Sequence, residues 1–448
     1  MLKCALQFAI SFRPTYSGVF PVDDEWEEWP VDLGGGPLDR TRFEKPPRWG
    51  GPLLSPLAVR VFRGLRRYII RTGPRIKEIE VRGAEHVRGA LDAGHGVLIT
   101  PNHSVHGDPM VLYEAADQFG SALYFMAAWQ VLGLANPVTR AFLRGHGCFS
   151  VDREGTDRQA LQQAVDVLQN RREPLVVFPE GEVYHCNERV TPFREGPAAM
   201  AVMATRKAER DVVIVPCGMR YYYVEDPLPD LMKLMDDVEE ALFWRPTPER
   251  PIAERLYRVA DGMLGLKELE FLGAARQGPV PDRIAFLTDG VLKRVEAKYE
   301  ISSEGKTIPE RIKQGRQRAI TAITDLAEES DEYRSCADDL DDCYLCAQLF
   351  SYPGDYVAER PSIDRLAETL DKFEEDILER PTATVRARRR AVVVLGEPIL
   401  VSKEKKRDAA SELTRTIEER VQSLLDSVQL PDRGFELVPP RDAGEAVG

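Results

Sequence analysis

Residues 97–114 read VLITPNHSVHGDPMVLYE, an apolar run followed by a polar turn and then a helical pattern. The run at residues 97–100 predicts a short buried strand. Asp108 and Pro109 predict a helix start, because a carboxylate accepts first-turn amide hydrogens and proline has no amide hydrogen to lose there. The stretch therefore predicts a strand, a loop and a helix in succession.

The loop in this stretch carries a histidine and an acid at a spacing that suits proton transfer. His103 lies five residues before Asp108. We expect the loop to fold back, so that the imidazole donates one ring N–H to the carboxylate and keeps its other nitrogen as a base. The pair alone does not define an enzyme, since an acid at a helix start is more often a cap and a histidine in a turn is more often solvated.

Short apolar runs alternate with helical patterns along the first half of the chain. The runs lie at residues 97–100, 123–126, 148–151, 175–178 and 212–215, and a further strand is expected at residues 78–81. Helical patterns begin at Pro109 and recur near residues 137–144, 157–168 and 197–210. This alternation predicts an α/β fold with a mostly parallel sheet flanked by helices, in which ligands bind beyond the carboxyl ends of the strands.

The second half of the chain predicts a large helical insertion, because a strand pattern returns at residues 391–395 and a helix pattern at 409–425. We divide the chain into an irregular N-terminal arm (1–50), a basic amphipathic helix (51–77), an α/β core (78–224), the insertion (225–385), a completion of the core (386–430) and a tail (431–448).

Composition narrows the functional class. The net charge of −13 argues against a general nucleic-acid binder, whose surface is basic. Seven scattered cysteines without a regular frame suggest reduced thiols in a cytoplasmic setting. Cys336, Cys343 and Cys346 fall short of a zinc set, and at helical spacing Cys343 and Cys346 are better read as core. We expect no metal and no cofactor.

The basic helix has two interpretations. Residues 46–77 hold eight Lys or Arg and no acid, and Arg60, Arg63, Arg67 and Arg71 fall on one side of the pattern. Such a helix can lie in a lipid headgroup layer, with each cation contributing about 1 kcal/mol near an anionic surface. It can also pack on the core of the protein with its arginines in water. No apolar run reaches the roughly 18 residues of a membrane span, so lipid contact would be peripheral.

Three further segments complete an ordered pattern. They are residues 147–153 (GCFSVDR), residues 178–181 (FPEG) and Val215 with Pro216. Together with Asn102-His103-x4-Asp108 they resemble the four motif blocks of the glycerophospholipid acyltransferase family, which includes the 1-acyl-sn-glycerol-3-phosphate acyltransferases. The resemblance covers about residues 78–223 and 391–427, and its order and spacing are more specific than any single block.

The resemblance implies a reaction and a site. A fatty acyl group would pass from acyl-CoA or acyl-carrier protein to a hydroxyl of a lysophospholipid, with lysophosphatidic acid as the expected acceptor, at the cytoplasmic face of a membrane. His103 would be the base and Asp108 its partner, Arg153 would bind the acceptor phosphate, and Asn102 would shape the loop. Gly181 and Arg194 would complete the acceptor site, and Glu180 would bind an acceptor hydroxyl or orient a basic group.

One departure from the family pattern leaves the acceptor open. The family often continues its third block with Thr-Arg-Ser, whereas this chain has Glu182, Val183 and Tyr184. The missing arginine allows another lipid alcohol as acceptor. Two other classes also stay open: a metal-dependent hydrolase with His103, His106 and Asp108 as ligands, and a non-catalytic lipid-binding protein.

Overall fold

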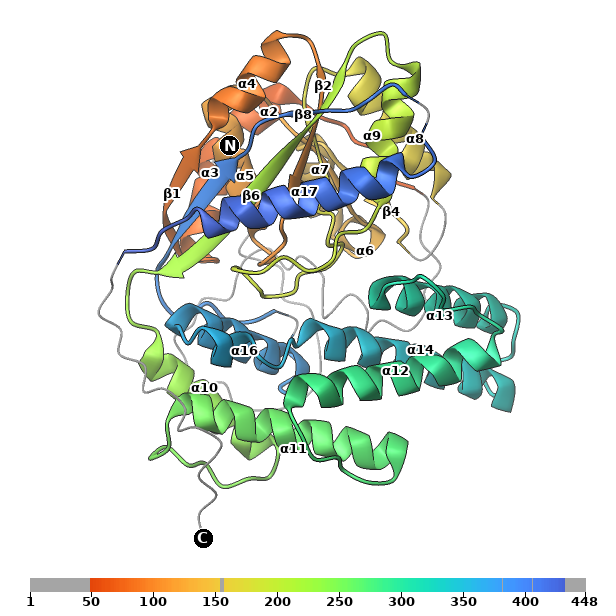
Figure 1. Ribbon diagram of the computed structural model, residues 1–448. Coiled ribbons are helices and arrows are strands. Elements are labelled where there is room, and N and C mark those ends of the chain that lie inside the picture. The colour runs from red at the N-terminus through yellow and green to blue at the C-terminus, as the bar shows by residue number, and fades with distance from the viewer. Residues whose placement is uncertain (1–48, 154–156, 381, 405, 432–448) are drawn as a thin grey trace.

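The computed structural model describes residues 49–153, 157–380, 382–404 and 406–431. The predicted arm, apart from residues 49 and 50, and the predicted tail, apart from residue 431, lie outside the described residues. Within them the chain forms an α/β unit and a large helical region, which Figure 1 shows as two layers, one above the other.

The α/β unit contains an eight-stranded sheet in which most neighbouring strands are parallel. The strands are β1 (Ile76–Arg82), β2 (Gly96–Pro101), β3 (Tyr124–Ala128), β4 (Cys148–Val151), β5 (Leu175–Val176), β6 (Val212–Tyr223), β7 (Arg389–Leu395) and β8 (Ile399–Leu400). Their order is β1-β7-β6-β2-β5-β3-β4, with β8 beside β6. Only the pairs that β6 makes with β7 and β8 are antiparallel among the described strands. The predicted fold class is confirmed.

Helices cover both faces of this sheet. On one face lie α4 (Ala84–Asp92) and α5 (Asp108–Phe119), and on the other lie α8 (Arg158–Asn170), α9 (Gly196–Lys207) and α17 (Ala409–Asp426). In the central strand β2, Val97 and Ile99 pack with the first group and Leu98 with the second. Two-sided burial explains why this strand is an uninterrupted apolar run.

The sheet brings three of the motif segments to one edge. Strands β2, β5, β3 and β4 are neighbours and run in the same direction. The loops that follow β2, β4 and β5 therefore leave from the same edge. These loops carry His103, Arg153 and Glu180 respectively.

The helical region is inserted between β6 and β7. It contains α10 (Leu228–Ala241), α11 (Ile252–Leu272), α12 (Val280–Lys298), α13 (Ile308–Ile323), α14 (Asp331–Ser351), α15 (Tyr356–Glu359) and α16 (Ile363–Asp376). Helix α14 carries Cys343 and Cys346, which are buried in a small apolar core as expected. Figure 1 shows α16, α14 and α13 nearest the sheet and α10 and α11 farthest from it.

An internal repeat holds successive helices of the insertion together. Arg255, Arg283 and Arg311 each occupy the fourth position of their helix, at a spacing of 28 residues. Each guanidinium donates hydrogen bonds to a buried glutamate on the preceding helix. The N–O distances are 2.8 Å for Arg255 with Glu239, 2.8 and 3.0 Å for Arg283 with Glu268, and 2.6 and 2.9 Å for Arg311 with Glu296. Breaking a buried pair of this kind costs roughly 3–5 kcal/mol. Buried ion pairs therefore connect four successive helices of the insertion, α10 to α13.

The basic segment forms two helices where the sequence pattern predicts one. They are α2 (Pro56–Val61) and α3 (Arg63–Thr72), which meet at Phe62. Arg66 is fully buried, whereas Arg63 and Arg67 pair with Asp117 at 2.6 Å and Glu114 at 2.9 Å on α5. Several of the arginines therefore bind the α/β unit, and apolar side chains are left at the surface instead.

Candidate active site

His103 and Asp108 form a hydrogen-bonded pair in the loop after β2. His103 Nδ1 lies 2.8 Å from Asp108 Oδ2, and the carboxylate is fully buried. An ionised carboxylate only accepts hydrogen bonds, so Nδ1 carries the proton and Nε2 is the basic nitrogen. The imidazole also stacks on the Phe178 ring, with the two ring centroids 4.1 Å apart. Two contacts thus fix the orientation of the ring.

Asp108 is held by loop amides that precede it. Its Oδ2 accepts the backbone N–H groups of Ser104 at 2.8 Å and Val105 at 3.2 Å, while Oδ1 accepts the hydroxyl of Tyr221 from β6. The expectation that Asp108 caps the first turn of its own helix is wrong, because the helix begins at Asp108 with Gly107 as its N-cap and no side chain caps it. The carboxylate instead folds the upstream loop back on itself.

Asn102 joins the same loop to the sheet. Its side chain accepts the Met219 backbone N–H at 2.7 Å and donates to the Met219 carbonyl oxygen at 3.0 Å. It also donates to the Ser104 hydroxyl at 2.8 Å, and it is fully buried. These contacts agree with the loop-shaping role predicted for this residue.

Glu180 is buried and also holds the His103 loop in place. Its Oε1 accepts the His103 backbone N–H at 2.8 Å, and its Oε2 accepts the backbone N–H of Thr191 at 3.2 Å and the Thr191 hydroxyl. Burial raises the pKa of Glu180 to about 8, which outweighs the lowering effect of these donors. A side chain in this position supports the His103 loop, which is closer to the second role considered for Glu180, the orientation of a basic group, than to contact with an acceptor hydroxyl.

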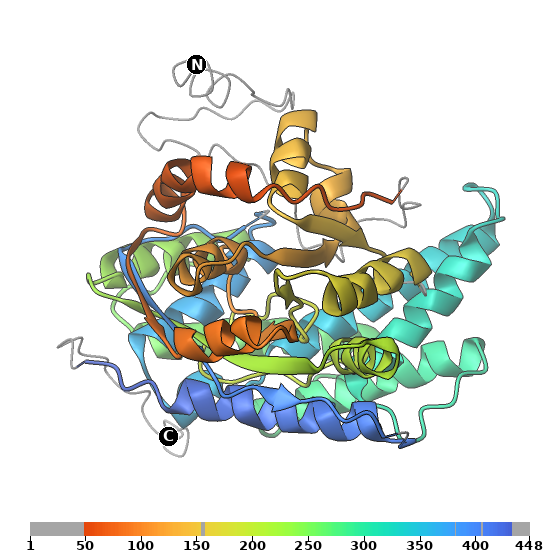
Figure 2. The same cartoon turned by 90° about the horizontal axis from the view of Figure 1, so that it is seen from above.

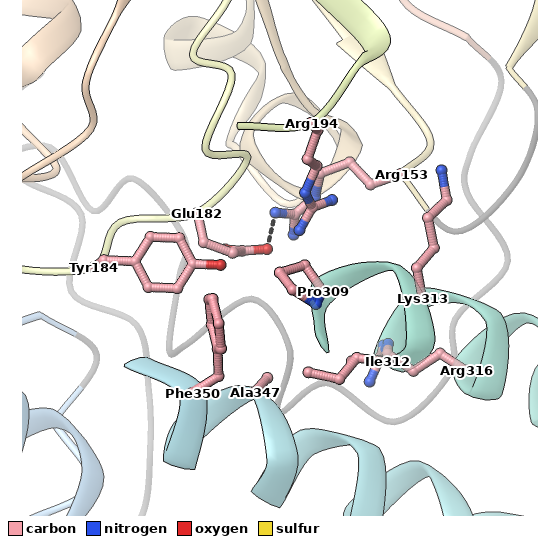
Figure 3. A pocket seen from close by; sticks show the side chains of 10 residues that line it. All are labelled: Arg153, Glu182, Tyr184, Arg194, Pro309, Ile312, Lys313, Arg316, Ala347 and Phe350. Atoms are coloured by element: carbon pink, nitrogen blue, oxygen red, sulfur yellow. Dashed lines mark hydrogen bonds and ion pairs between the residues drawn. The ribbon is translucent and has the colours of Figure 1, made fainter. Parts of the chain in front are cut away.

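A pocket opens between the α/β unit and the insertion (Figure 3). Its empty volume is about 470 Å³, including the part open to solvent. The lining residues are Arg153, Glu182, Tyr184, Arg194, Pro309, Ile312, Lys313, Arg316, Ala347 and Phe350. The backbone N–H of Tyr184 donates to the His103 carbonyl oxygen at 3.3 Å, so the pocket wall is continuous with the His103 loop.

The pocket brings together two of the predicted anion ligands. Arg153 donates to the Gly181 carbonyl oxygen at 2.5 Å and pairs with Glu182. Arg194 Nε is buried and has no hydrogen-bond partner among the described residues. Gly181 has φ +78°, and a Cβ there would lie 2.6 Å from Arg194 Nε. Glycine at this position lets the guanidinium pass close to the backbone.

Several residues of the site were not found from the sequence. Tyr221 donates a hydrogen bond to Asp108, and Thr191 donates one to Glu180. Lys313 and Arg316 line the pocket from α13. Figure 3 shows that Lys313 and Arg316 come from α13, whereas Arg153 and Arg194 come from the α/β unit. No short motif marks these positions, because they become neighbours only when the insertion folds against the sheet edge.

The metal-ligand set considered in the sequence analysis does not assemble. His103 and Asp108 bind each other, and His106 lies instead beside His185 and Glu375. Burial lowers the pKa of His103 below its ordinary 6.5, although Asp108 acts in the opposite direction. His103 is therefore neutral at pH 7, in the form that accepts a proton.

The comparison with known families agrees with this geometry. Residues 78–220 match the family model described as Acyltransferase. The matched residues extend from β1 to within β6 and include all four motif segments. The insertion and the final strands and helix lie outside the matched residues. The search of curated proteins found no matching relative.

The raised pKa of Glu180 predicts a pH-dependent stability. Between about pH 4.5 and 8 the folded chain retains a proton on Glu180 that the unfolded chain releases, so this group stabilises the fold below that window and the contribution is lost as pH rises through it. Glu180→Gln does not titrate. The difference in free energy of unfolding, variant minus wild type, should increase from pH 4.5 to 8 in urea titrations.

The matched control is Glu209→Gln, which replaces an exposed glutamate. Its difference from the wild type should not change over the same pH range. A flat profile for Glu180→Gln would show that Glu180 titrates normally and is not held in the way described.

Proposed function

We propose that the chain is an O-acyltransferase that moves a fatty acyl group from a thioester to a hydroxyl of a lysophospholipid. The observation that carries the proposal is the oriented His103–Asp108 pair within an acyltransferase domain, beside a pocket with four cationic side chains. The donor is acyl-CoA or acyl-carrier protein. Lysophosphatidic acid is the proposed acceptor.

The proposed reaction requires one base and no covalent enzyme intermediate. The acceptor oxygen attacks the thioester carbonyl carbon while its proton passes to His103 Nε2. The buried carboxylate of Asp108 stabilises the imidazolium that forms. When the tetrahedral intermediate collapses, the C–S bond breaks and the imidazolium returns the proton to the thiolate. The products are an ester and a free thiol.

The structure narrows the possible oxyanion donors. The tetrahedral intermediate needs hydrogen-bond donors for its oxyanion, and backbone amides of the loop around Gly107 are the candidates. Those of Ser104 and Val105 donate to Asp108, and that of His103 donates to Glu180. These three amides already serve to hold the catalytic pair, so they are excluded as donors to the developing negative charge.

Removing either member of the pair should abolish most of the activity. His103→Ala should lower kcat by about 10²- to 10⁴-fold, the usual contribution of a general base. Asp108→Asn should lower kcat and shift the acidic limb of the kcat/KM profile to lower pH, because Asp108 raises the pKa of His103. Radiolabelled acyl-CoA with a lyso-lipid acceptor provides the assay at several pH values.

The control for these variants is His95→Ala, a partly exposed histidine outside the site. It should retain wild-type kcat. Wild-type rates in His103→Ala would contradict the assignment of the base and with it the proposed function.

The charge of the pocket predicts selectivity for an anionic acceptor. Arg194→Ala should raise KM for lysophosphatidic acid by about tenfold or more, since a charged hydrogen bond is worth roughly 1.5–3 kcal/mol. KM for a zwitterionic lyso-lipid should change much less. Equal effects on both acceptors, or a wild-type preference for a neutral lipid alcohol, would favour the alternative acceptor that the missing arginine of the third block suggests.

We also propose that α2 and α3 contact a membrane surface. Leu57, Val61, Leu65 and Tyr68 are exposed on these helices, with 71% of Leu57 and 67% of Val61 accessible. Val138 on α7 (Pro137–Gly145) is also exposed, and α7 lies beside α2 and α3 because Phe62 contacts Phe142. In the part of the chain that the structure describes, no helix has the length and apolarity to cross a bilayer.

Replacing the exposed side chains should weaken membrane binding without affecting the reaction. Leu57→Ser with Val61→Ser should reduce co-sedimentation with anionic lipid vesicles by about tenfold or more, because each fully buried Leu or Val contributes roughly 1.5–3 kcal/mol. Activity on a micellar acceptor should be unchanged. Leu266→Ser with Leu269→Ser, two exposed leucines on α11, is the control. Unchanged sedimentation of the α2 variant would contradict the proposal.

A further inference from the structure

Three residues from distant parts of the sequence converge next to the catalytic loop. His106 lies between His103 and Asp108, His185 lies in the loop before α9, and Glu375 lies on α16 of the insertion. Their side-chain nitrogen and oxygen atoms all lie within 4.8 Å of one another. The chain has six histidines, and two of them, His106 and His185, belong to this cluster.

Two of the separations are close to those between ligands of one small metal ion. His106 Nε2 lies 3.5 Å from Glu375 Oε1, and His185 Nε2 lies 3.1 Å from Glu375 Oε2. Around a tetrahedral Zn²⁺, with bonds of roughly 2.1 Å, neighbouring ligand atoms lie about 3.4 Å apart. The two imidazole rings are nearly perpendicular, at 72°, so both Nε2 atoms can approach one point from different directions. Since the widest pair of ligand atoms can lie as far as 4.8 Å apart, the side chains must also move closer together to hold one ion.

The surroundings hold the ligands in place. His185 is buried, and Glu375 is mostly buried and accepts the Ala383 backbone N–H at 2.9 Å through Oε1. A hydrogen bond to a ligating carboxylate is a common second contact of metal sites. The nearby cation Lys372 is turned to other partners, since its ammonium group donates to the Ser351 carbonyl oxygen and lies over the Tyr352 ring.

A different explanation is that the two histidines only form ion pairs with Glu375 and bind no metal. Glu375 holds both histidines, and its negative charge raises the pKa of His185 against the opposing effect of burial. A pairing role needs one histidine beside one carboxylate. It does not require a second imidazole nitrogen from another segment at the same carboxylate, with His106 remaining 39% exposed and open to an incoming ion.

We propose that His106, His185 and Glu375 bind a divalent transition metal ion of the Zn²⁺ type, with the fourth position open to solvent. Imidazole and carboxylate ligands suit such an ion better than Mg²⁺ or Ca²⁺, which prefer oxygen. The ion ties the His103–Asp108 loop to α16 and so joins the insertion to the catalytic edge of the sheet. This site departs from the expectation of no metal, and it does not depend on which reaction the chain catalyses.

The test is metal binding by the full chain after treatment with a chelator and removal of that chelator. Calorimetric titration with Zn²⁺ should show one ion per chain, and the melting temperature should rise with Zn²⁺. His106→Ala, His185→Ala and Glu375→Gln should each weaken binding by at least about 100-fold, which is the upper range for loss of even a supporting contact. His95→Ala should bind as the wild type does.

Two further measurements exclude trivial results. The visible spectrum of the Co²⁺ form should lack thiolate-to-metal charge transfer, since the proposed ligands contain no sulfur; a thiolate band would assign the ion to cysteines and overturn the site. Circular dichroism of His106→Ala, a partly exposed position, should match the wild type, so that its weaker binding reports on the ligand and not on folding. Absence of saturable binding, or equal binding by the wild type and all three variants, would also overturn the proposal.

Discussion

The arrangement of the candidate site depends on one buried carboxylate. Asp108 accepts hydrogen bonds from the His103 ring, two loop amides and the Tyr221 hydroxyl, and it has no exposed surface. A buried charge is tolerated only when its hydrogen-bonding capacity is filled. The fold therefore must supply those donors, and in supplying them it fixes both the loop and the tautomer of the imidazole.

The sequence predicted the elements of the core because their signals are local. Apolar runs of four or five residues, helix starts at Asp108 and near Asp157, and the order of the motif segments require no knowledge of distant contacts. The direction in which a side chain points is not local in this way. Asp108 was predicted to cap its own helix as well as to hold His103, yet its carboxylate accepts the amide of Ser104 upstream instead of one from its own first turn. Glu180 had two predicted roles, and its carboxylate accepts the His103 amide. Patterns show which groups are present, whereas hydrogen-bond competition decides which partner each one takes.

The insertion was predicted as helical, but neither its repeat nor its contribution to the site was foreseen. The arginines at positions 255, 283 and 311 are marked by a spacing of 28 residues, a signal that a search for internal repeats would detect. In contrast, Lys313 and Arg316 of α13 have no pattern that links them to Arg194, since that proximity exists only in the folded chain. Lys313 and Arg316 of the insertion add positive charge to the pocket that Arg153 and Arg194 of the α/β unit also line. On α16, Glu375 lies beside His106 of the catalytic loop.

The central claim is that Asp108 holds His103 as the neutral tautomer protonated at Nδ1. Nuclear magnetic resonance of protein labelled with ¹⁵N at histidine tests it directly, with the His103 signals assigned by their absence in His103→Gln. At pH 7 the spectrum should show a protonated Nδ1 and an unprotonated Nε2, and this pattern should be lost in Asp108→Asn. A His103 protonated at Nε2, or a tautomer balance unaffected by Asp108→Asn, would contradict the account.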